Sequence, residues 1–129
     1  MPKYVCMDLG LKRIGLAYSP DGKLVTPLPA VIRKNRNQAS LEVDQALKEW
    51  EADIFVIGLP MSDPETQAEM RRRISHFLSL LSFKGEVYYQ DEDDSSLEAE
   101  EMMKGDIRYK RDGRIDSLAA KIILERYLI

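Results

Sequence analysis

Short apolar runs separated by turn residues dominate the first third of the chain. The three runs span residues 3–9, 14–18 and about 23–33. Runs of this length that are bounded by Gly, Pro and Asp are typical of β-strands. Pro27 and Pro29 remove two ladder donors from the third run, so we expect it at a sheet edge, or interrupted there. Because the connections are short, the three strands are predicted to form an antiparallel meander.

The apolar period then changes from that of a strand to that of a helix. Val43, Leu47 and Trp50 recur at four- and three-residue steps, which predicts a helix over roughly residues 37–51. Residues 53–58 follow as a nearly continuous apolar run. Such a strand is covered on both faces, and this indicates parallel pairing inside a layered α/β sheet.

Two further helices are predicted from capping patterns. Ser62 and Glu65 have the spacing of a capping box, in which each side chain satisfies an amide at the helix start. The buried stripe of this helix extends to Leu81. Ser95 and Glu98 repeat the spacing and begin a short helix that ends near residue 105.

The last strand and the last helix each carry acidic residues at one end. Residues 86–90 are the predicted strand, and it delivers Asp91 and Glu92 at its carboxyl end. The final helix has Asp116 in its first turn, where the helix dipole favours a carboxylate. Between these two elements, the polar and basic segment 105–113 is predicted to be a mobile loop.

These elements follow one another as strand, strand, strand, helix, strand, helix, strand, helix, helix. A meander followed by βα crossovers predicts an α/β fold with a mixed five-stranded sheet and helices on both sides. The length of 129 residues fits one domain over residues 1–129. Open α/β sheets bind ligands beyond the carboxyl ends of their strands, and Asp8, Asp91 and Glu92 all fall at such ends.

The acidic residues at these positions indicate a site that binds metal ions. Asp8, the Asp91-Glu92 pair and Asp116 are far apart in sequence, and if the fold gathers them, divalent cations must offset their repulsion. This arrangement suggests phosphodiester chemistry. Strand alternation sends neighbouring side chains to opposite faces, so only one of Asp91 and Glu92 points into the site. We choose Glu92, with Asp91 as the alternative.

The charges are separated along the chain. The balance of 19 basic and 22 acidic residues, a net charge of -3, argues against a protein that coats nucleic acid over its whole surface. Residues 90–101 hold seven acids and no Lys or Arg, whereas residues 104–114 hold five basic residues and two acids. Each remaining basic cluster is interpreted first as a solvated face. These clusters are Lys12-Arg13, Arg33-Lys34 with Arg36, and Arg71-Arg72-Arg73.

The composition and the first residues of the chain predict where in the cell the protein is located. Apolar residues make up 44% of the chain, and no apolar run reaches the length of a membrane span. The first residues show no secretory signal, so we expect a cytosolic protein without a membrane partner.

Four segments together resemble a known family. Residues 8–17 (DLGLKRIGLA) resemble the opening Asp-x-Gly-x-Lys-x-Ile-Gly motif of the YqgF/RuvX proteins. Residues 56–60 (VIGLP) are similar to that family's Val-Gly-Leu-Pro step, and Asp91-Glu92 is similar to its acidic strand exit. Residues 115–124 (IDSLAAKIIL) resemble its C-terminal helix, which carries an Asp and several Ala. The opening motif alone would also fit sugar kinases and actin-like ATPases, but the four motifs occur in order over nearly the whole chain.

The resemblance implies a ribonuclease H-like fold and a nuclease linked to pre-16S ribosomal RNA maturation and to Holliday-junction resolution. It implies Asp8, Glu92 and Asp116 as catalytic residues, and these three with Asp91 as ligands for Mg²⁺ or Mn²⁺. The implied partner is nucleic acid, either pre-rRNA or branched DNA. Both a monomer and a homodimer stay open, because only symmetric junction cleavage needs a two-fold dimer. Candidate contacts to backbone phosphates are Lys12, Arg13, Arg108, Lys110, Arg111 and Arg114.

One segment departs from the family pattern. The family continues Asp-Glu-Arg-Leu followed by Ser or Thr, whereas this chain has Asp93 and Asp94 in place of the Arg and Leu. An arginine there could hold a phosphate, and Asp93 instead makes the site more anionic. An RNA-binding ribosome-assembly factor with weakened catalysis therefore remains an alternative to the nuclease. A small actin-like nucleotide hydrolase is a third hypothesis, for which the chain is about one domain short.

Overall fold

The computed structural model describes residues 1–104 and 113–129. Its strands are β1 (Tyr4–Leu9), β2 (Arg13–Ser19), β3 (Thr26–Ile32), β4 (Ile54–Leu59) and β5 (Glu86–Asp91). Its helices are α1 (Arg36–Glu49), α2 (Pro64–Ser79), α3 (Ser95–Met103) and α4 (Arg114–Leu128). The order of elements is the predicted one. Apart from Gly113, the loop predicted over 105–113 lies outside the described residues.

The strands form one mixed sheet in the order β3-β2-β1-β4-β5. β1 and β3 both pair antiparallel with β2, and β4 pairs parallel with both β1 and β5. The predicted meander, the edge position of the proline-bearing strand and the parallel pairing of β4 are therefore confirmed. The carboxyl ends of β1, β4 and β5 lie at the same edge of the sheet, which is where Asp8 and Glu92 are found.

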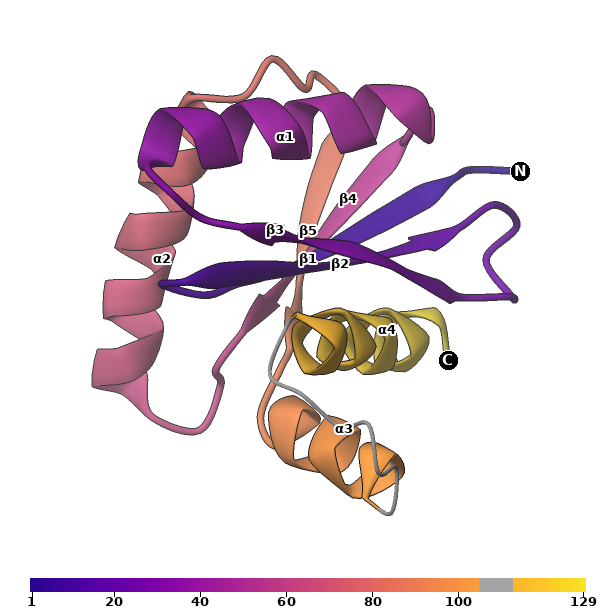
Figure 1. Ribbon diagram of the computed structural model, residues 1–129, viewed down its shortest axis with the longest axis vertical. Coiled ribbons are helices and arrows are strands. Elements are labelled where there is room, and N and C mark those ends of the chain that lie inside the picture. Colours follow the sequence, from indigo (N-terminus) through magenta and orange to yellow (C-terminus); the bar gives the residue numbers. More distant parts are fainter. Residues whose placement is uncertain (105–112) are drawn as a thin grey trace.

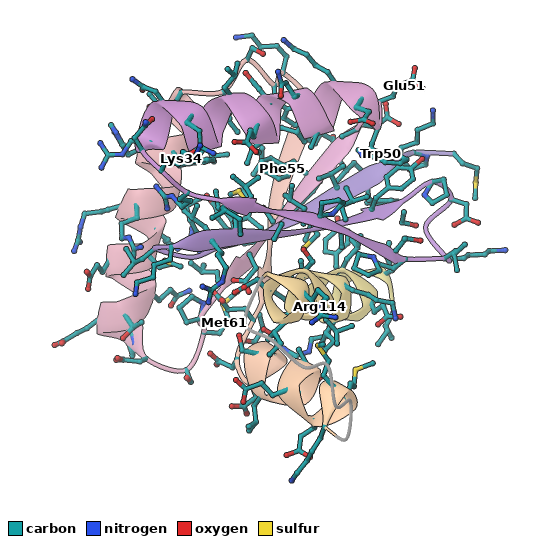
Figure 2. All side chains as sticks on the ribbon, in the orientation of Figure 1. Lys34, Trp50, Glu51, Phe55, Met61 and Arg114 are labelled. Carbon is teal, nitrogen blue, oxygen red and sulfur yellow. The ribbon has the colours of Figure 1, made fainter. Side chains whose placement is uncertain are left out.

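Helices cover both faces of the sheet (Figure 1): α1 and α2 lie on one side, α4 lies on the other, and α3 packs against α4. Odd-numbered residues of β1 and β4 are buried on the α1/α2 face, and Phe55 among them lies between the sheet and α1 (Figure 2). Even-numbered residues such as Cys6 and Val56 pack against Ile123 on the α4 face. Strand alternation therefore puts the side chain of Asp8 on the α4 face as well.

The helix caps differ from the predicted ones. The capping box predicted at Ser62 is wrong, because Asp63 caps α2 by accepting a hydrogen bond from the amide of Glu65, and Pro64 is the first helical residue. The amide of Ser62 instead donates to Asp93 Oδ2 at 3.0 Å, which ties the β4–α2 loop to the acidic turn after β5.

The start of α3 also differs. Ser95 does not cap this helix, because it is buried inside it and its amide donates to the carbonyl of Glu92 at 3.0 Å. The capping position belongs to Asp94, whose backbone is left-handed with a φ of 63° and whose side chain makes no capping bond. α1 carries a complete capping box that was not predicted from the sequence, formed by Asn35 and Gln38. No helix among residues 1–104 and 113–129 is long and apolar enough to cross a membrane.

Candidate functional site

Two carboxyl groups meet on the α4 face at the carboxyl edge of the sheet. Asp8 comes from the end of β1, Glu92 is the first residue after β5, and the two side chains are hydrogen-bonded. Gly58 in β4 lies between these strands. A Cβ at this position would lie 2.8 Å from Ile123 Cδ1 and 3.1 Å from Glu92 Cβ. The absence of a side chain at Gly58 therefore leaves the room in which the pair meets.

A second glycine brings the start of α4 to the same place. Gly15 in β2 is the direct cross-strand partner of Asp8, and a Cβ there would overlap the backbone carbonyl of Asp116. The amide of Leu16 donates to Ser117 Oγ at 3.3 Å, which fixes the first turn of α4 on β2. The first and last of the predicted acids are thus neighbours across a single glycine.

The side chain of Asp116 is paired with a cation. Its Oδ2 accepts a hydrogen bond from Arg13 Nε at 2.7 Å, and about a quarter of each side chain is exposed, 26% for Asp116 and 23% for Arg13. Arg13 was predicted to contact phosphate. That contact stays a prediction; in the structure, Arg13 pairs with Asp116, the third acid of the site.

The partly buried carboxyl pair favours a shared proton. Burial is the largest cause that raises the pKa of Asp8, to about 6, and the charge of Asp116 raises it further. Burial also raises the pKa of Glu92, to about 8, and the charge of Asp8 and the hydrogen bond to Asp8 add to the effect. The hydrogen bond lowers the pKa of Asp8 and raises that of Glu92, and the two carboxyls titrate as a pair.

The donor set fits a hard divalent cation. Glu92 Oε1 is the one buried side-chain nitrogen or oxygen among the described residues that has no hydrogen-bond partner. Such an orphaned oxygen beside a second carboxylate matches the preference of Mg²⁺ and Mn²⁺ for oxygen ligands. As the side chains stand, no group of three or more His, Cys, Asp and Glu in residues 1–104 and 113–129 is arranged to hold an ion. The Asp116 carboxylate is paired with Arg13, and its part in a metal site stays a prediction.

Asp91 has a different role from Glu92. Its Oδ1 accepts a hydrogen bond from the amide of Asp93 at 2.8 Å, so this carboxylate stabilises the turn after β5. Arg126 of α4 reaches the same turn and donates to the carbonyls of Asp91 and Asp93 at 3.1 and 2.9 Å. Its other terminal nitrogen pairs with Glu98 at 3.1 Å. Arg126 thus brings a guanidinium to the turn in which Asp93 replaces the family's arginine, and no sequence pattern singled it out.

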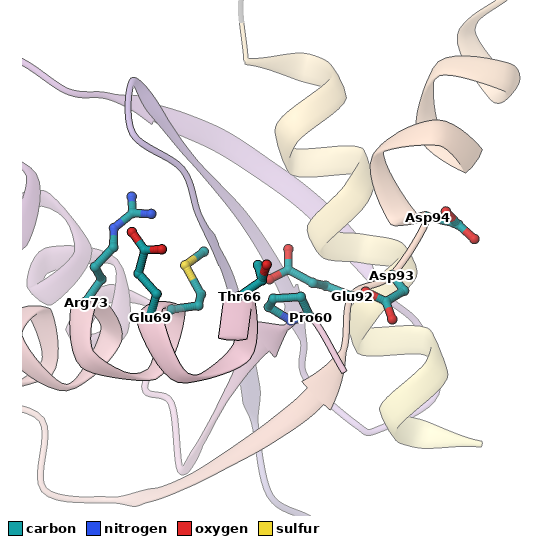
Figure 3. Close-up of a pocket in the computed structure, with 8 residues that line it drawn as sticks. Pro60, Thr66, Glu69, Arg73, Glu92, Asp93 and Asp94 are labelled. Atoms are coloured by element: carbon teal, nitrogen blue, oxygen red, sulfur yellow. The ribbon is translucent and has the colours of Figure 1, made fainter. Parts of the chain in front are cut away.

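A cleft of about 340 Å³ opens beside Glu92 (Figure 3). Asp93 and Asp94 extend one end of it, and Arg73 of α2 lies at the other end beside Glu69, with Thr66 and Pro60 between. The cleft therefore joins the acidic turn to a cationic side chain that was not among the predicted phosphate contacts.

The remaining predicted contacts are dispersed or outside the described residues. Lys12 is exposed in the β1–β2 loop. Arg114 is the exposed first residue of α4 and lines a groove against β3. Arg108, Lys110 and Arg111 fall outside residues 1–104 and 113–129.

Residues 2–129 match the RuvX family, which is described as Holliday junction resolvase. The chain belongs to this family. It is 60% identical over 126 residues to a protein of Sulfurimonas denitrificans named "Putative pre-16S rRNA nuclease", covering 98% of this chain and 96% of that protein. A protein of Sulfurovum sp. with the same name is 54% identical, and the alignment covers 98% of both chains. The resemblance drawn from the four motifs is confirmed.

Solved structures with the same fold bind branched DNA. RuvC of T. thermophilus in complex with a Holliday junction substrate superposes with a TM-score of 0.61 and 14% identity, covering 99% of this chain and 94% of that one. The resolvase of Fowlpox virus in complex with Holliday junction DNA gives a TM-score of 0.52 at 13% identity, covering 98% and 99%. At these identities the likeness establishes the fold, and the predicted ribonuclease H-like architecture is confirmed.

Proposed function

We propose that this RuvX-family protein is a divalent-metal-dependent nuclease that hydrolyses phosphodiester bonds of pre-16S rRNA during processing of its 5′ end. The observation that carries the proposal is the hydrogen-bonded Asp8–Glu92 pair with its orphaned Oε1, at the sheet edge where α/β folds bind ligands. The names of the relatives supply the substrate.

Asp8 and Glu92 would hold the metal. Both must then be ionised, so the cation takes over the role of the shared proton in offsetting their repulsion. When bound, Mg²⁺ or Mn²⁺ supplies an activated water and stabilises the departing oxygen of the phosphodiester. Asp116 would complete the ligand set by leaving Arg13, and Arg13 would then be free to donate to the incoming phosphate.

A cleavage assay tests the proposal. Labelled precursor 16S rRNA is incubated with Mn²⁺ or with EDTA, using the wild type, Asp8→Asn and the control Asp21→Asn, which removes an exposed carboxylate of a turn. We expect cleavage only with metal, a loss of about 100-fold or more in Asp8→Asn, and no change in Asp21→Asn. Absence of metal-dependent cleavage, or full activity of Asp8→Asn, would contradict the proposal. Retained RNA affinity without cleavage would favour the assembly-factor alternative.

Holliday-junction resolution is the second candidate function. The family description and the junction complexes of the two structural neighbours favour it. Resolution requires paired cuts placed symmetrically across the junction and hence a two-fold dimer. Four-way junction DNA in the same assay, with sedimentation of the protein–DNA complex, separates this activity from RNA cleavage by a monomer.

A further inference from the structure

A second cavity, of about 280 Å³, opens at the same edge of the sheet but on the α1/α2 face. We name it the arginine pocket. The charged and aromatic side chains that line it are Arg33, Arg36, Arg72, Arg73, His76 and Phe77. Among the residues that the structure describes, no Asp or Glu lines it, although the chain as a whole carries more acids than bases.

The charged and aromatic side chains of the pocket come from two separate segments. Arg33 and Arg36 come from the junction of β3 and α1, while the other side chains come from one edge of α2, where Arg72 and His76 are four residues apart. Lys34, which is labelled in Figure 2, lies in the connection between β3 and α1, next to α2. Arg33 is fixed in place, because its Nη1 donates to the carbonyl of Gly10 at 2.6 Å and its guanidinium lies 5.7 Å from the centre of the Phe77 ring.

The charge in the pocket is not neutralised within the described part of the chain. There, Arg36, Arg72 and Arg73 make neither an ion pair nor a side-chain hydrogen bond. Burial lowers the pKa of Arg33, and the charges of Arg73 and Arg36 lower it further. Gathered cations without acids repel one another, and a bound anion would offset that repulsion.

The pocket adjoins the carboxylate site. Arg73 lines both the arginine pocket and the cleft that contains Glu92. Leu9, which also lines the pocket, follows Asp8 in β1, so the two residues face opposite sides of the same strand end. A ligand that extends over this edge of the sheet can therefore reach the carboxyl pair and the arginine pocket together.

We propose that the arginine pocket binds a backbone phosphate of the same nucleic-acid strand that reaches the Asp8–Glu92 pair. This inference rests on the proposed function. Guanidinium groups present paired donors that match phosphate oxygens, and a site made of carboxylates needs cations nearby to retain a polyanion. Two basic clusters thereby contribute to one site, although the sequence alone indicated that each was a solvated face. They are Arg33-Lys34 with Arg36, and Arg71-Arg72-Arg73.

Two double variants with equal charge loss test the pocket. Arg36→Gln with Arg72→Gln removes two guanidinium groups that line it. The control is Lys34→Gln with Arg71→Gln, which removes the neighbouring cations outside it; Arg71 lies instead over the ring of Tyr89, 4.9 Å from its centre. Affinity for a precursor 16S rRNA fragment and for four-way junction DNA is measured in EDTA, so that binding is read without cleavage, over a series of salt concentrations.

We expect the pocket variant to bind at least about 10-fold more weakly at low salt and to lose about one unit of the slope of log affinity against log salt, as for one phosphate contact. The control is expected to lose less than about 3-fold, which is the general effect of net charge. Equal losses in the two variants, no loss in either, or no binding by the wild type would overturn the inference. A wild type that binds through the pocket but does not cleave with Mn²⁺ would contradict the proposed function alone. A comparison of the affinities for the RNA fragment and for the junction DNA identifies which nucleic acid the pocket binds.

Discussion

At the scale of single residues, the site depends on how Asp8 and Glu92 share a proton. Both pKa values are raised above those of free carboxyls, so between about pH 4 and pH 8 the folded state holds more protons than the unfolded state. The pair's contribution to stability is therefore largest below the ordinary carboxyl pKa and is lost as pH rises through about 6 and then about 8.

This linkage predicts that the metal-free protein loses stability between pH 6 and pH 8.5. We expect a fall in the free energy of unfolding on the order of 1–3 kcal/mol, measured by urea unfolding in EDTA. The double variant Asp8→Asn with Glu92→Gln should flatten the profile, because neither side chain then titrates. Asp21→Asn is the control, since hydrogen bonds from the amides of Lys23 and Leu24 lower the pKa of this exposed carboxyl below the window. A wild-type profile as flat as that of the double variant would contradict the shared proton.

Gly58 gives a second prediction at this scale. In Gly58→Ala the new methyl group meets Ile123 and displaces Glu92, so we expect a cost of about 1–3 kcal/mol in stability together with a large loss of nuclease activity. Val56→Ile overfills the same α4-side core two residues earlier in β4 and serves as the control. Unfolding and cleavage are measured on both variants. If activity falls equally in the two, the loss comes from general overpacking and not from the position of Glu92.

At the scale of elements, Arg126 connects the end of α4 to the acidic turn and to α3. Arg126→Gln is predicted to destabilise the protein by about 1–3 kcal/mol, because the carbonyls of Asp91 and Asp93 lose a charged donor. Amide hydrogen exchange should accelerate at residues 92–98, where Ser95 donates to Glu92 and Glu98 donates to Asp94.

Lys121→Gln is the matched control, since it breaks only a side-chain ion pair on the same helix, with Glu125, and is expected to cost less than about 0.5 kcal/mol. Unchanged exchange in Arg126→Gln would mean that the turn is held by its own backbone hydrogen bonds.

At this scale, the order of the elements could be predicted from the sequence alone, but the starts of two helices could not. Strand and helix order, the edge position of β3 and the parallel pairing of β4 followed from period, proline placement and apolar runs, which are local signals. The starts of α2 and α3 did not. Ser62 and Ser95 have the capping spacing, but the long-range bond from the Ser62 amide to Asp93 and the burial of Ser95 overrode that local preference.

At the scale of the whole molecule, the sequence predicted that Asp8, Glu92 and Asp116 lie at the ends of strands and helices. The resemblance to the family then identified these three as candidate site residues. The sequence could not predict that Asp116 pairs with Arg13, because that contact depends on how α4 packs on Gly15 of β2. It also could not join the arginines of the β3–α1 junction to those of α2, since only the tertiary fold brings them together. The helical spacing of Arg72 and His76 was the one local sign of that pocket.

The proposed function requires that acids from both ends of the chain hold a divalent metal in one site. The most direct measurement is anomalous diffraction from a crystal of the wild-type protein soaked in Mn²⁺ at about pH 8, where ionisation of the carboxyl pair is favoured. We expect an anomalous peak within about 2.0–2.6 Å of oxygens of Asp8 and Glu92, with the Asp116 carboxylate turned from Arg13 toward the ion. A saturating soak that leaves these oxygens without a peak, with Asp116 still paired to Arg13, would contradict the proposed function.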